Sequence, residues 1–511
     1  MGVFLRIVGA LFATWCVRTV LYLIRVRRFP PGPPRPILLD NRGDMAFKQN
    51  WKAFHDWNKK YGSIISFYLG RKPLVVLGSL DAVTDLLEKK GNIYSSRPRF
   101  IVAGEILCRN MRGLGMPYGQ RWRNWRSLMH ASMSIEASAA YKPLQSAETK
   151  IMLRDILQNQ DSPEKFPDFI RRYAVSVVTV VAYGRRIKTL EDHLVVKQQK
   201  IDEYYINSTV PGKFLVEIFP ILTWLPKSLQ WYRREPEEHY KKDVALLTEL
   251  MEEVRERMKK GLAYPSTATR ALEKQGAFGL DDLETAYALA SPFGAGAGTT
   301  LATLDFFLLA MLIHPEAMRK AHEELDRVIG RDRLPEYDDR DSLPYVNALI
   351  KEIMRWRPIA PIAVPHSVIA DDEYKGHFIP KGTTVIGSIY SITQNEEMFP
   401  DPETFRPDRY IENPKLPNSF VFGFGRRVCP GMHVAQNSLF SIVSKMLWAY
   451  EILPTKDSQG KPIIPSKDDI IPALVIKPKP FNFLLVPRHG NVAAIVTEEA
   501  RKADVELAAY E

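Results

Sequence analysis

The chain has 511 residues, 45% of them hydrophobic and 25% charged, and its formal net charge at pH 7 is +11. This composition is that of an ordinary globular protein and excludes a collagen-like or intrinsically disordered chain. Three cysteines are too few for a disulfide framework, so a reducing compartment is expected. The basic balance suits an anionic membrane or an acidic protein partner. No nucleic-acid partner is predicted, because the basic residues form no long run.

The N-terminal segment is apolar over residues 7–24, interrupted only by Arg18 and a few small polar residues. A spanning helix needs ~20 such residues, and Arg18 can snorkel toward the nearer interface. Arginines at positions 25, 27 and 28 favour a cytoplasmic side after the segment. Residues 1–28 are therefore expected to form a single-pass membrane anchor. A cleaved signal peptide is the alternative, disfavoured because no clear small-residue cleavage site follows the apolar stretch.

The next residues, 29–36, are proline-rich and are expected to form a stiff, extended hinge. Residues 37–489 then form the predicted catalytic domain. Within it, strands are expected over residues 63–69 and 74–77 as a hairpin, over 373–378 and 383–388 as a second pair, and as a third short pair within 471–486.

Helical periodicity dominates residues 81–357, for example over 243–260 and 316–329. Many helices with a few small sheets and no regular βαβ alternation predict a mainly α, α+β fold. The last residues, 490–511, are rich in alanine and charge, and are expected to form a loose surface helix.

One glycine-rich segment carries most of the chemistry. It runs Phe422-Gly-Phe-Gly-Arg-Arg427-Val-Cys429-Pro-Gly431 and precedes an apolar helical stretch. Glycines let the backbone approach a flat cofactor, and nearby N–H groups and arginines stabilise a thiolate. The pattern resembles the haem-binding loop of the haem-thiolate monooxygenases, the cytochrome P-450 family. The resemblance implies a haem b whose iron is ligated by the Cys429 thiolate.

Further motifs follow in the order of that family, and their roles are implied by the resemblance. Glu352 and Arg355, three residues apart on one helix face, would form a buried network with Arg409. Trp122 and Arg126, one helical turn apart, would bind the haem propionates together with Arg427 and His366. An ordinary surface ion pair and a surface helix are the alternatives for these two motifs.

A second glycine-rich segment, residues 294–300, lies in an apolar helical stretch. Glycines inside a helix cost roughly 0.5–1 kcal/mol each relative to alanine, so a bulge over a ligand is expected, with close helix packing as the alternative. The segment resembles the oxygen-binding groove of the family, which implies that Thr299, supported by Thr300, assists proton delivery to dioxygen. The family usually has an acid just before that threonine, where this chain has Gly298.

The substrate pocket is mapped from the variable segments of the family and is overwhelmingly apolar, which suits a lipophilic substrate. Its predicted lining residues are Phe100, Ile101, Phe293, Ala295, Ile359, Ile362, Ala363, Ile471 and Leu474. The segments at 208–214 and 355–361 resemble fungal secondary-metabolism members, which implies a terpenoid, polyketide or indole-type natural product.

The combined prediction is a monooxygenase of the endoplasmic-reticulum membrane with a cytoplasmic catalytic domain. Because the chain has no room for a fused flavin reductase, electrons from NADPH must come from a partner reductase, with cytochrome b5 as a second candidate donor. Four basic residues could dock such a partner: Arg121, Arg123, Lys351 and Arg426. Two alternatives remain. One is an isomerase or dehydratase of the same fold that needs no dioxygen, suggested by Gly298; the other is a non-catalytic haem-binding protein.

Overall fold

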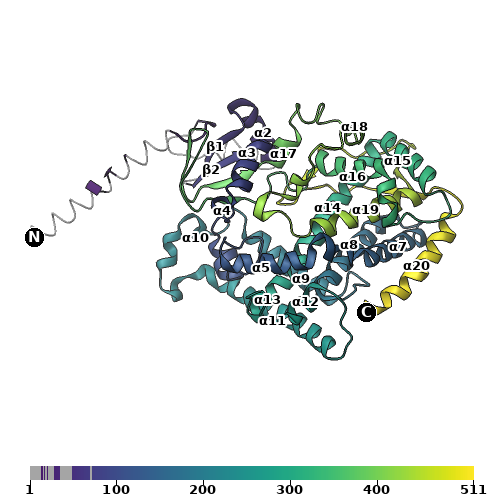
Figure 1. Cartoon of the computed structure of the whole chain (residues 1–511), viewed down its shortest axis with the longest axis horizontal. Coiled ribbons are helices and arrows are strands. Elements are labelled where there is room, and N and C mark those ends of the chain that lie inside the picture. Colours follow the sequence, from purple (N-terminus) through teal and green to yellow (C-terminus); the bar gives the residue numbers. More distant parts are fainter. Residues whose placement is uncertain are drawn as a thin grey trace, which may run out of the picture. The chain divides into compact units, whose positions relative to one another are not determined.

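The computed structural model describes residues 13–14, 16–17, 20, 28–34, 49–69, 72–274 and 276–510. The predicted membrane anchor therefore lies almost wholly outside the described residues. The chain divides into two compact units, each built from several stretches of sequence (Figure 1). The first comprises Met1–Pro98, Ile362–Asn395 and Phe424–Arg426, and the second Arg99–Pro361, Glu396–Gly423 and Arg427–Glu511.

The first unit is built on a four-stranded sheet of order β1-β2-β6-β3. Strands β1 (Ile64–Leu69) and β2 (Lys72–Leu77) form the predicted antiparallel hairpin, with Ile64 opposite Leu77. Strand β6 (Thr384–Gly387) runs parallel to β2, and β3 (His366–Ser367) pairs antiparallel with β6. Apolar side chains of β1, β2 and β6 form one core cluster with Phe54 of helix α2 (Asn50–Tyr61). The remaining helical elements of this unit are α3 (Leu80–Val83), η2 (Thr84–Lys89), α4 (Gly91–Tyr94) and α17 (Ile389–Thr393).

The described part of the predicted hinge is docked on β1. The backbone N–H of Ser66 donates to the carbonyl of Pro31 at 2.8 Å, and the Ser66 hydroxyl donates to the carbonyl of Pro30. A Cβ atom at Gly32 would lie 1.8 Å from the Ser66 carbonyl oxygen, so only glycine allows this approach. The described residues of the proline-rich segment are thus fixed to the sheet of the first unit.

The predicted pairing of residues 373–378 with 383–388 is wrong. Residues in the first of these stretches form their own hairpin, β4 (Asp372–Tyr374) with β5 (His377–Ile379), while β6 joins the larger sheet. The reason is the two-residue turn Lys375-Gly376, where both residues have positive φ, of 49° and 80°. That combination is the type I′ geometry that closes the tightest hairpins.

The second unit is mainly helical, and its central helix is α14 (Ser291–Ile313), which packs against α8 (Phe166–Tyr183), α16 (Pro344–Trp356) and α19 (Met432–Ala449). The apolar segment Asp282–Ile313 is long enough to cross a membrane, but 56% of its most apolar window is buried, as expected of a core helix. The other helices are α5 (Gln120–Met133), α6 (Ile135–Ala139), α7 (Lys142–Gln158), α9 (His193–Ser208), α10 (Leu215–Ile218), α11 (Arg234–Lys259), α12 (Thr267–Glu273), α13 (Asp282–Leu289), α15 (Pro315–Val328), α18 (Arg409–Glu412) and α20 (Val492–Leu507). Short helical turns are η3 (Ile101–Leu107), η4 (Pro163–Lys165), η5 (Pro220–Trp224), η6 (Lys227–Leu229), η7 (Trp231–Arg233), η8 (Tyr337–Ser342), η9 (Ser419–Phe422) and η11 (Ala508–Tyr510).

Two small antiparallel pairs complete this unit. Strands β8 (Ile470–Ile471) and β9 (Lys477–Pro478) form a short pair in the region predicted to contain one. Strand β10 (Phe483–Pro487), at the end of that region, pairs instead with β7 (Tyr450–Pro454).

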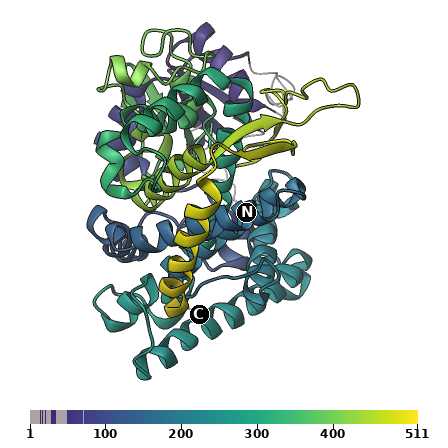
Figure 2. The same ribbon diagram turned by 90° about the vertical axis from the view of Figure 1, so that its right-hand side faces the viewer.

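The C-terminal helix α20 is packed against α7, which corrects the prediction of a loose surface helix (Figure 2). Ala500, Ala503 and Leu507 are buried in one cluster with apolar side chains of α7 and with Val180 of α8. Small alanines at this spacing let the two helices approach closely. The tail is therefore an integral part of the second unit.

Candidate functional site: a cysteine loop above a buried helix

The cysteine loop is closed by backbone geometry. The N–H of Cys429 donates to the carbonyl of Phe422 at 2.9 Å, and Gly423 and Gly425 both have positive φ, 88° and 53°. Such φ values favour glycine, which explains why the loop needs it at these two positions. Helix α19 begins just beyond, with Gly431 as its N-cap.

The sulfur of Cys429 lies at the N-terminal end of α19. Burial raises the pKa of the Cys429 thiol, whereas the backbone N–H of Gly431 and the charge of Arg126 act in the opposite direction. A helix N-terminus and a nearby cation are the features that stabilise a thiolate, and a bound metal ion deprotonates a coordinating thiol. Among the described residues there is no cluster of three or more His, Cys, Asp or Glu side chains that could hold a metal ion.

Cationic and indole side chains of the second unit gather beside the loop. Arg126 donates from Nη1 to the carbonyl of Val428 at 2.6 Å. Arg427 donates to the carbonyl of Met116 at 2.7 Å, and its guanidinium lies 4.5 Å from the ring centroid of Trp122. The Nε1 atom of Trp122 is buried and has no hydrogen-bond partner among the described residues. Burial lowers the pKa of the Arg126 guanidinium, so an anion beside it would be bound strongly.

His366 lies in the first unit, on β3, where its Nδ1 atom is 2.7 Å from the carbonyl oxygen of Tyr94. Arg97 is a second buried cation of the same unit and lies outside the motifs predicted from the sequence. Its Nη1 atom donates to the carbonyls of Val364 and Pro365, directly before His366, at 2.7 and 2.9 Å. Nothing in its sequence context distinguishes Arg97 from a surface arginine.

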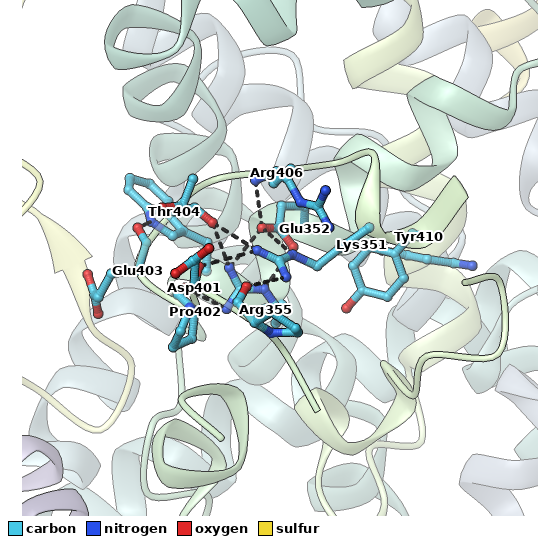
Figure 3. Close-up of polar contacts among 12 residues, drawn as sticks. Lys351, Glu352, Arg355, Asp401, Pro402, Glu403, Thr404, Arg406 and Tyr410 are labelled. Carbon is cyan, nitrogen blue, oxygen red and sulfur yellow. Dashed lines mark hydrogen bonds and ion pairs between the residues drawn. The ribbon is translucent and has the colours of Figure 1, made fainter. Parts of the chain in front are cut away.

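Glu352, Arg355 and Arg409 form the predicted buried network. Figure 3 shows Arg355 beside Glu352, with Arg406 next to them. Arg355 binds the carboxylate in a bidentate way, through Nε and Nη2, with both distances 2.8 Å. Arg409 adds a third contact at 3.1 Å, and the backbone N–H of Arg406 a fourth at 2.8 Å. The Glu352 side chain is 0% exposed, so the surface ion pair considered for this motif is excluded.

The same two arginines hold the following loop. Arg355 donates to the carbonyl of Pro402 at 2.8 Å, and Arg409 donates to the carbonyl of Pro400 at 3.0 Å. Burial lowers the pKa of Arg409, and Glu352 opposes that shift. Because two cations meet one carboxylate, carbonyl oxygens of this loop complete the solvation of the extra positive charge.

Helix α14 is continuous through its glycines, so the predicted bulge is not present. The Thr299 hydroxyl donates back to the carbonyl of Ala295 at 2.8 Å. A Cβ atom at Gly296 would lie 2.5 Å from Cγ1 of Val178, which supports the alternative of close helix packing at that position. At Gly298, by contrast, no heavy atom lies within 4 Å of such a Cβ atom. Thr300 is half-buried.

The predicted pocket residues fall in both units. Ile101 belongs to a core cluster of the second unit, and Phe293 is buried on α14. The N–H of Ile476, in the loop between Leu474 and β9, donates to the carbonyl of Ile359 at 2.8 Å, which joins two of the predicted segments. The predicted residues with intermediate burial are Phe100, Ile359, Ile362, Ile471 and Leu474, whereas Ala295 is exposed. Ile362 and Ala363 belong to the first unit, and Ala363 has a positive φ of 50°.

A family model described as Cytochrome P450 matches residues 30–485 of the chain. The chain belongs to the cytochrome P450 family. Its curated relatives include cytochrome P450 monooxygenase 58 of Postia placenta, 36% identical over 485 residues, which are 93% of this chain and 91% of that protein. Cytochrome P450 monooxygenase drtD of Aspergillus calidoustus is 36% identical over 486 residues, 95% of this chain and 91% of its own length. Cytochrome P450 monooxygenase virE of Hypocrea virens is 36% identical over 489 residues, 93% and 88% of the two chains.

This P450 is a monooxygenase with the mainly helical fold predicted from its sequence. Its family binds haem iron through a cysteine thiolate and uses dioxygen with electrons from a reductase. The residues present fit that group. Within the described residues the buried Trp122 Nε1 has no acceptor, Arg427 lies over the Trp122 ring, and Arg126 donates to the Val428 carbonyl. These donors suit a propionate carboxylate.

Proposed function

We propose that this P450 oxidises a lipophilic small molecule, most simply by hydroxylation, using dioxygen and electrons that a partner reductase draws from NADPH. The arrangement around Cys429 is the observation that carries this proposal. Its sulfur lies at the start of α19, and Arg126, which donates to the carbonyl of Val428 in the same loop, belongs to a donor set that fits a haem. When bound, the haem would supply the oxygen-activating chemistry, with its iron held by the Cys429 thiolate.

The proposed haem site uses residues with three tasks. Cys429 ligates the iron, and Phe422 and Gly431 shape the loop that holds the sulfur. Trp122, Arg126 and Arg427 bind propionates through hydrogen bonds and charge. His366, which is buried with its Nδ1 atom 2.7 Å from the carbonyl oxygen of Tyr94, is proposed as a further propionate partner because its position matches a basic propionate partner of the family. This set is typical of haem b, which is bound without covalent attachment.

Thr299 is proposed to hold and pass a proton at its Oγ1 atom, with Thr300 as its neighbour on the helix. The hydroxyl donates to the Ala295 carbonyl, so its oxygen can accept a hydrogen bond from water while the side chain remains anchored. The open space at Gly298 leaves room for water, which can carry protons where a carboxylate is missing. An isomerase or dehydratase reaction is not favoured by any contact in the described residues.

The proposed substrate is a terpenoid, polyketide or indole-type natural product. The candidate pocket residues are apolar and bring no charged side chain toward the substrate. Apolar surfaces of this kind bind by burial of hydrocarbon rather than by ion pairs.

Membrane attachment is proposed from two features. One is the apolar segment before residue 25, which we propose as the membrane anchor. In the proposed domain organisation the anchor is followed by the hinge 29–36, the catalytic domain 37–489 and the tail 490–511. The other is a run of exposed apolar side chains between α9 and α11. Its members are Val210, Leu215, Ile218, Phe219, Ile221, Trp224, Leu229 and Trp231. Trp224 is 82% exposed, and apolar side chains gathered in this way mark a membrane or protein contact. The proposed location is the endoplasmic-reticulum membrane, with the catalytic domain in the cytoplasm.

The proposed electron donor is a flavoprotein reductase, with cytochrome b5 as a second partner. Arg121, Arg123 and Lys351 of the second unit, and Arg426 of the first, are the basic residues offered to an acidic donor. Arg121 is ion-paired with Glu284, and Lys351 lies over the ring of Tyr410, so both are held in place.

The experiment that tests the proposed function is substitution of the ligand. Cys429→Ala should give protein that lacks the thiolate-type absorption of the haem and has no NADPH-driven oxygenation. A Cys108→Ala variant is the matched control, since Cys108 is a buried cysteine outside the loop, with its Sγ atom 3.0 Å from the carbonyl oxygen of Ala103. Thiolate-type absorption in Cys429→Ala would contradict the ligand assignment.

A further inference from the structure

Three elements of the second unit bring charged groups together beside α14. Arg112, in the loop before α5, donates to Asp202 of α9, with 2.8 Å between Nη1 and Oδ1. Asp243 of α11 is the second carboxyl of the cluster and is only 2% exposed. Its Oδ1 atom has no hydrogen-bond partner among the residues that the structure describes. A buried carboxyl in this state is costly when ionised and much less costly when protonated.

The charge of the Arg112 guanidinium acts on both Asp202 and Asp243. Burial raises the pKa of Asp243 to about 7, Arg112 acts to lower it, and the charge of Asp202 raises it further. Near neutral pH, Asp243 therefore carries an exchangeable proton for part of the time. The two side chains differ in access to solvent, because Asp202 is 19% exposed whereas Asp243 is buried.

Other polar groups that surround the pair are mostly neutral. Gln198 donates from Nε2 to Oδ2 of Asp202 at 3.1 Å. Arg112 lies over the ring of Tyr205, with 4.6 Å to the centroid. The hydroxyls of Tyr183 and Tyr287 are buried and unpartnered within the described part of the chain. Asp243 also acts on Tyr204, and Cys108 and Tyr240 act on Tyr287; the pKa of each of these two tyrosines is raised chiefly by burial. No second cation among these groups neutralises Asp243.

The cluster touches α14 at Gly294, one helical turn before Gly298, the position where the family usually has an acid. A Cβ atom at Gly294 would lie 2.9 Å from Oδ1 of Asp202, so the carboxylate occupies the space of a side chain at that position. Gly298 follows four residues later on the same face of the helix, and the space over it is open. The Asp202 carboxylate is therefore about one helical turn, roughly 6 Å along the axis, from the position that carries an acid in the family.

We infer that the Asp202–Asp243 pair is the proton source for the groove at Gly298 and Thr299, replacing from α9 and α11 the acid that α14 lacks. This inference rests on the proposed function. One proton leaves the pair through water over Gly298 toward Thr299, and another enters from solvent at Asp202, so no bond other than O–H is broken and no electron is moved. Because the pair acts through water and Thr299, its members are positioning residues of a relay rather than groups that touch the substrate.

The first test reads the proton itself and needs no turnover. Infrared difference spectra of the full-length holoprotein, recorded in light and heavy water across neutral pH, should contain a protonated-carboxyl band that titrates near pH 7. Asp243→Asn should remove that band. Asp155→Asn is the control, because Asp155 is also a partly buried acid whose pKa burial raises, but it lies between Arg154 and Arg172 on α7 and α8. A titrating band that persists in both Asp243→Asn and Asp202→Asn would overturn the inference.

The second test follows the fate of the proton. With reductase, NADPH and dioxygen but no added substrate, electrons leave as water when protons are delivered and as hydrogen peroxide when delivery is slow. Asp202→Asn and Asp243→Asn should slow water formation by about 100-fold, the scale of lost general-acid assistance, and raise the peroxide fraction. Adding Gly298→Asp to Asp202→Asn should restore water formation, since it puts an acid back on α14. A purely structural ion pair would predict no such rescue.

The outcomes separate the two proposals. If the wild-type protein consumes no dioxygen with reductase, the proposed function fails, while the infrared band still decides the state of the pair. If the protein turns over normally and the band is absent, only the relay fails. Should Asp243→Asn not fold, the titration of the wild-type protein and the Gly298→Asp variant still decide, because an added acid should make the peroxide fraction insensitive to Asp202→Asn.

Discussion

The guanidinium of Arg427 lies over the indole ring of Trp122, 4.5 Å from the ring centroid. This contact joins the cysteine loop to helix α5, so the loop and the helix that bears Arg126 hold each other in register. A cation over an indole face contributes about 0.5–2 kcal/mol. The indole nitrogen at the edge of the same ring still lacks an acceptor within the described residues, and a propionate would provide one.

Trp122→Phe should therefore weaken haem binding while leaving the fold intact. It removes one buried donor to a charged acceptor, worth about 1.5–3 kcal/mol, which corresponds to a loss of affinity of about 10-fold or more. Haem occupancy measured during titration of the apoprotein checks this. Trp125→Phe is the control on the same helix, because its Nε1 already donates to the Ser291 hydroxyl at 3.2 Å. Equal losses in both variants would argue against a propionate at Trp122.

Glu352→Gln should destabilise the second unit strongly. The substitution leaves Arg355 and Arg409 buried without a counter-charge, and breaking a buried pair in this way costs about 3–5 kcal/mol. Glu498→Gln removes a pair of the same three-residue spacing, Arg501–Glu498, on the surface of α20 and should barely change the unfolding midpoint. Chemical denaturation of both variants measures the difference, and similar midpoints would contradict the role of the network.

The C-terminal helix should contribute to stability through one face only. Ala503→Asp would bury a carboxylate in the cluster that α20 shares with α7, at a cost of at least about 3 kcal/mol. Val505→Asp, two residues later on the exposed side, should change stability by less than about 0.5 kcal/mol. A helix that is loosely attached, as its composition suggested, would tolerate both substitutions equally.

Stability should rise with alkaline pH through Lys445. Burial lowers the pKa of Lys445 to about 8 even though Glu336 lies 3.1 Å away. Because the unfolded state keeps its proton up to about 10.5, it binds more protons than the native state between about pH 8 and 10.5, so the free energy of unfolding increases across that window. The full effect is roughly 3 kcal/mol. Lys445→Met should flatten this rise, whereas Lys320→Met, at an exposed pair with Asp408, should not.

Local sequence patterns predicted much of the fold, whereas features that depend on contacts between distant parts of the chain were not predicted. The β1–β2 hairpin was predicted from two apolar strands with a short turn between them. The β4–β5 hairpin depends on the positive φ of Lys375, and a lysine in the sequence does not predict a positive φ. Helix α11 starts at Arg234, nine residues before the predicted start, because Pro236 lies in its first turn, where proline is tolerated. The Glu352 network was predicted, since its motif has a fixed order along the chain.

The remainder of the site could not be predicted for a physical reason. The proposed relay combines a loop and two helices that are far apart in sequence and contribute Arg112, Asp202 and Asp243. Each of these charged residues, taken alone, would be predicted to lie on the surface. Only packing shows that Asp243 is buried and that Gly294 makes room for Asp202. The prediction of a bulge in α14 was wrong for the same reason. The helix is continuous, and glycines 294 and 296 make room for side chains of neighbouring helices.

The most direct test of the central claim is oxygen incorporation. The full chain, co-expressed with an NADPH-dependent reductase in microsomes and loaded with haem, would be supplied with a lipophilic extract under heavy-isotope dioxygen. The account predicts a new product that carries a single heavy oxygen atom and requires NADPH. A product formed without NADPH and without label would contradict it, and would point to isomerisation on the same fold.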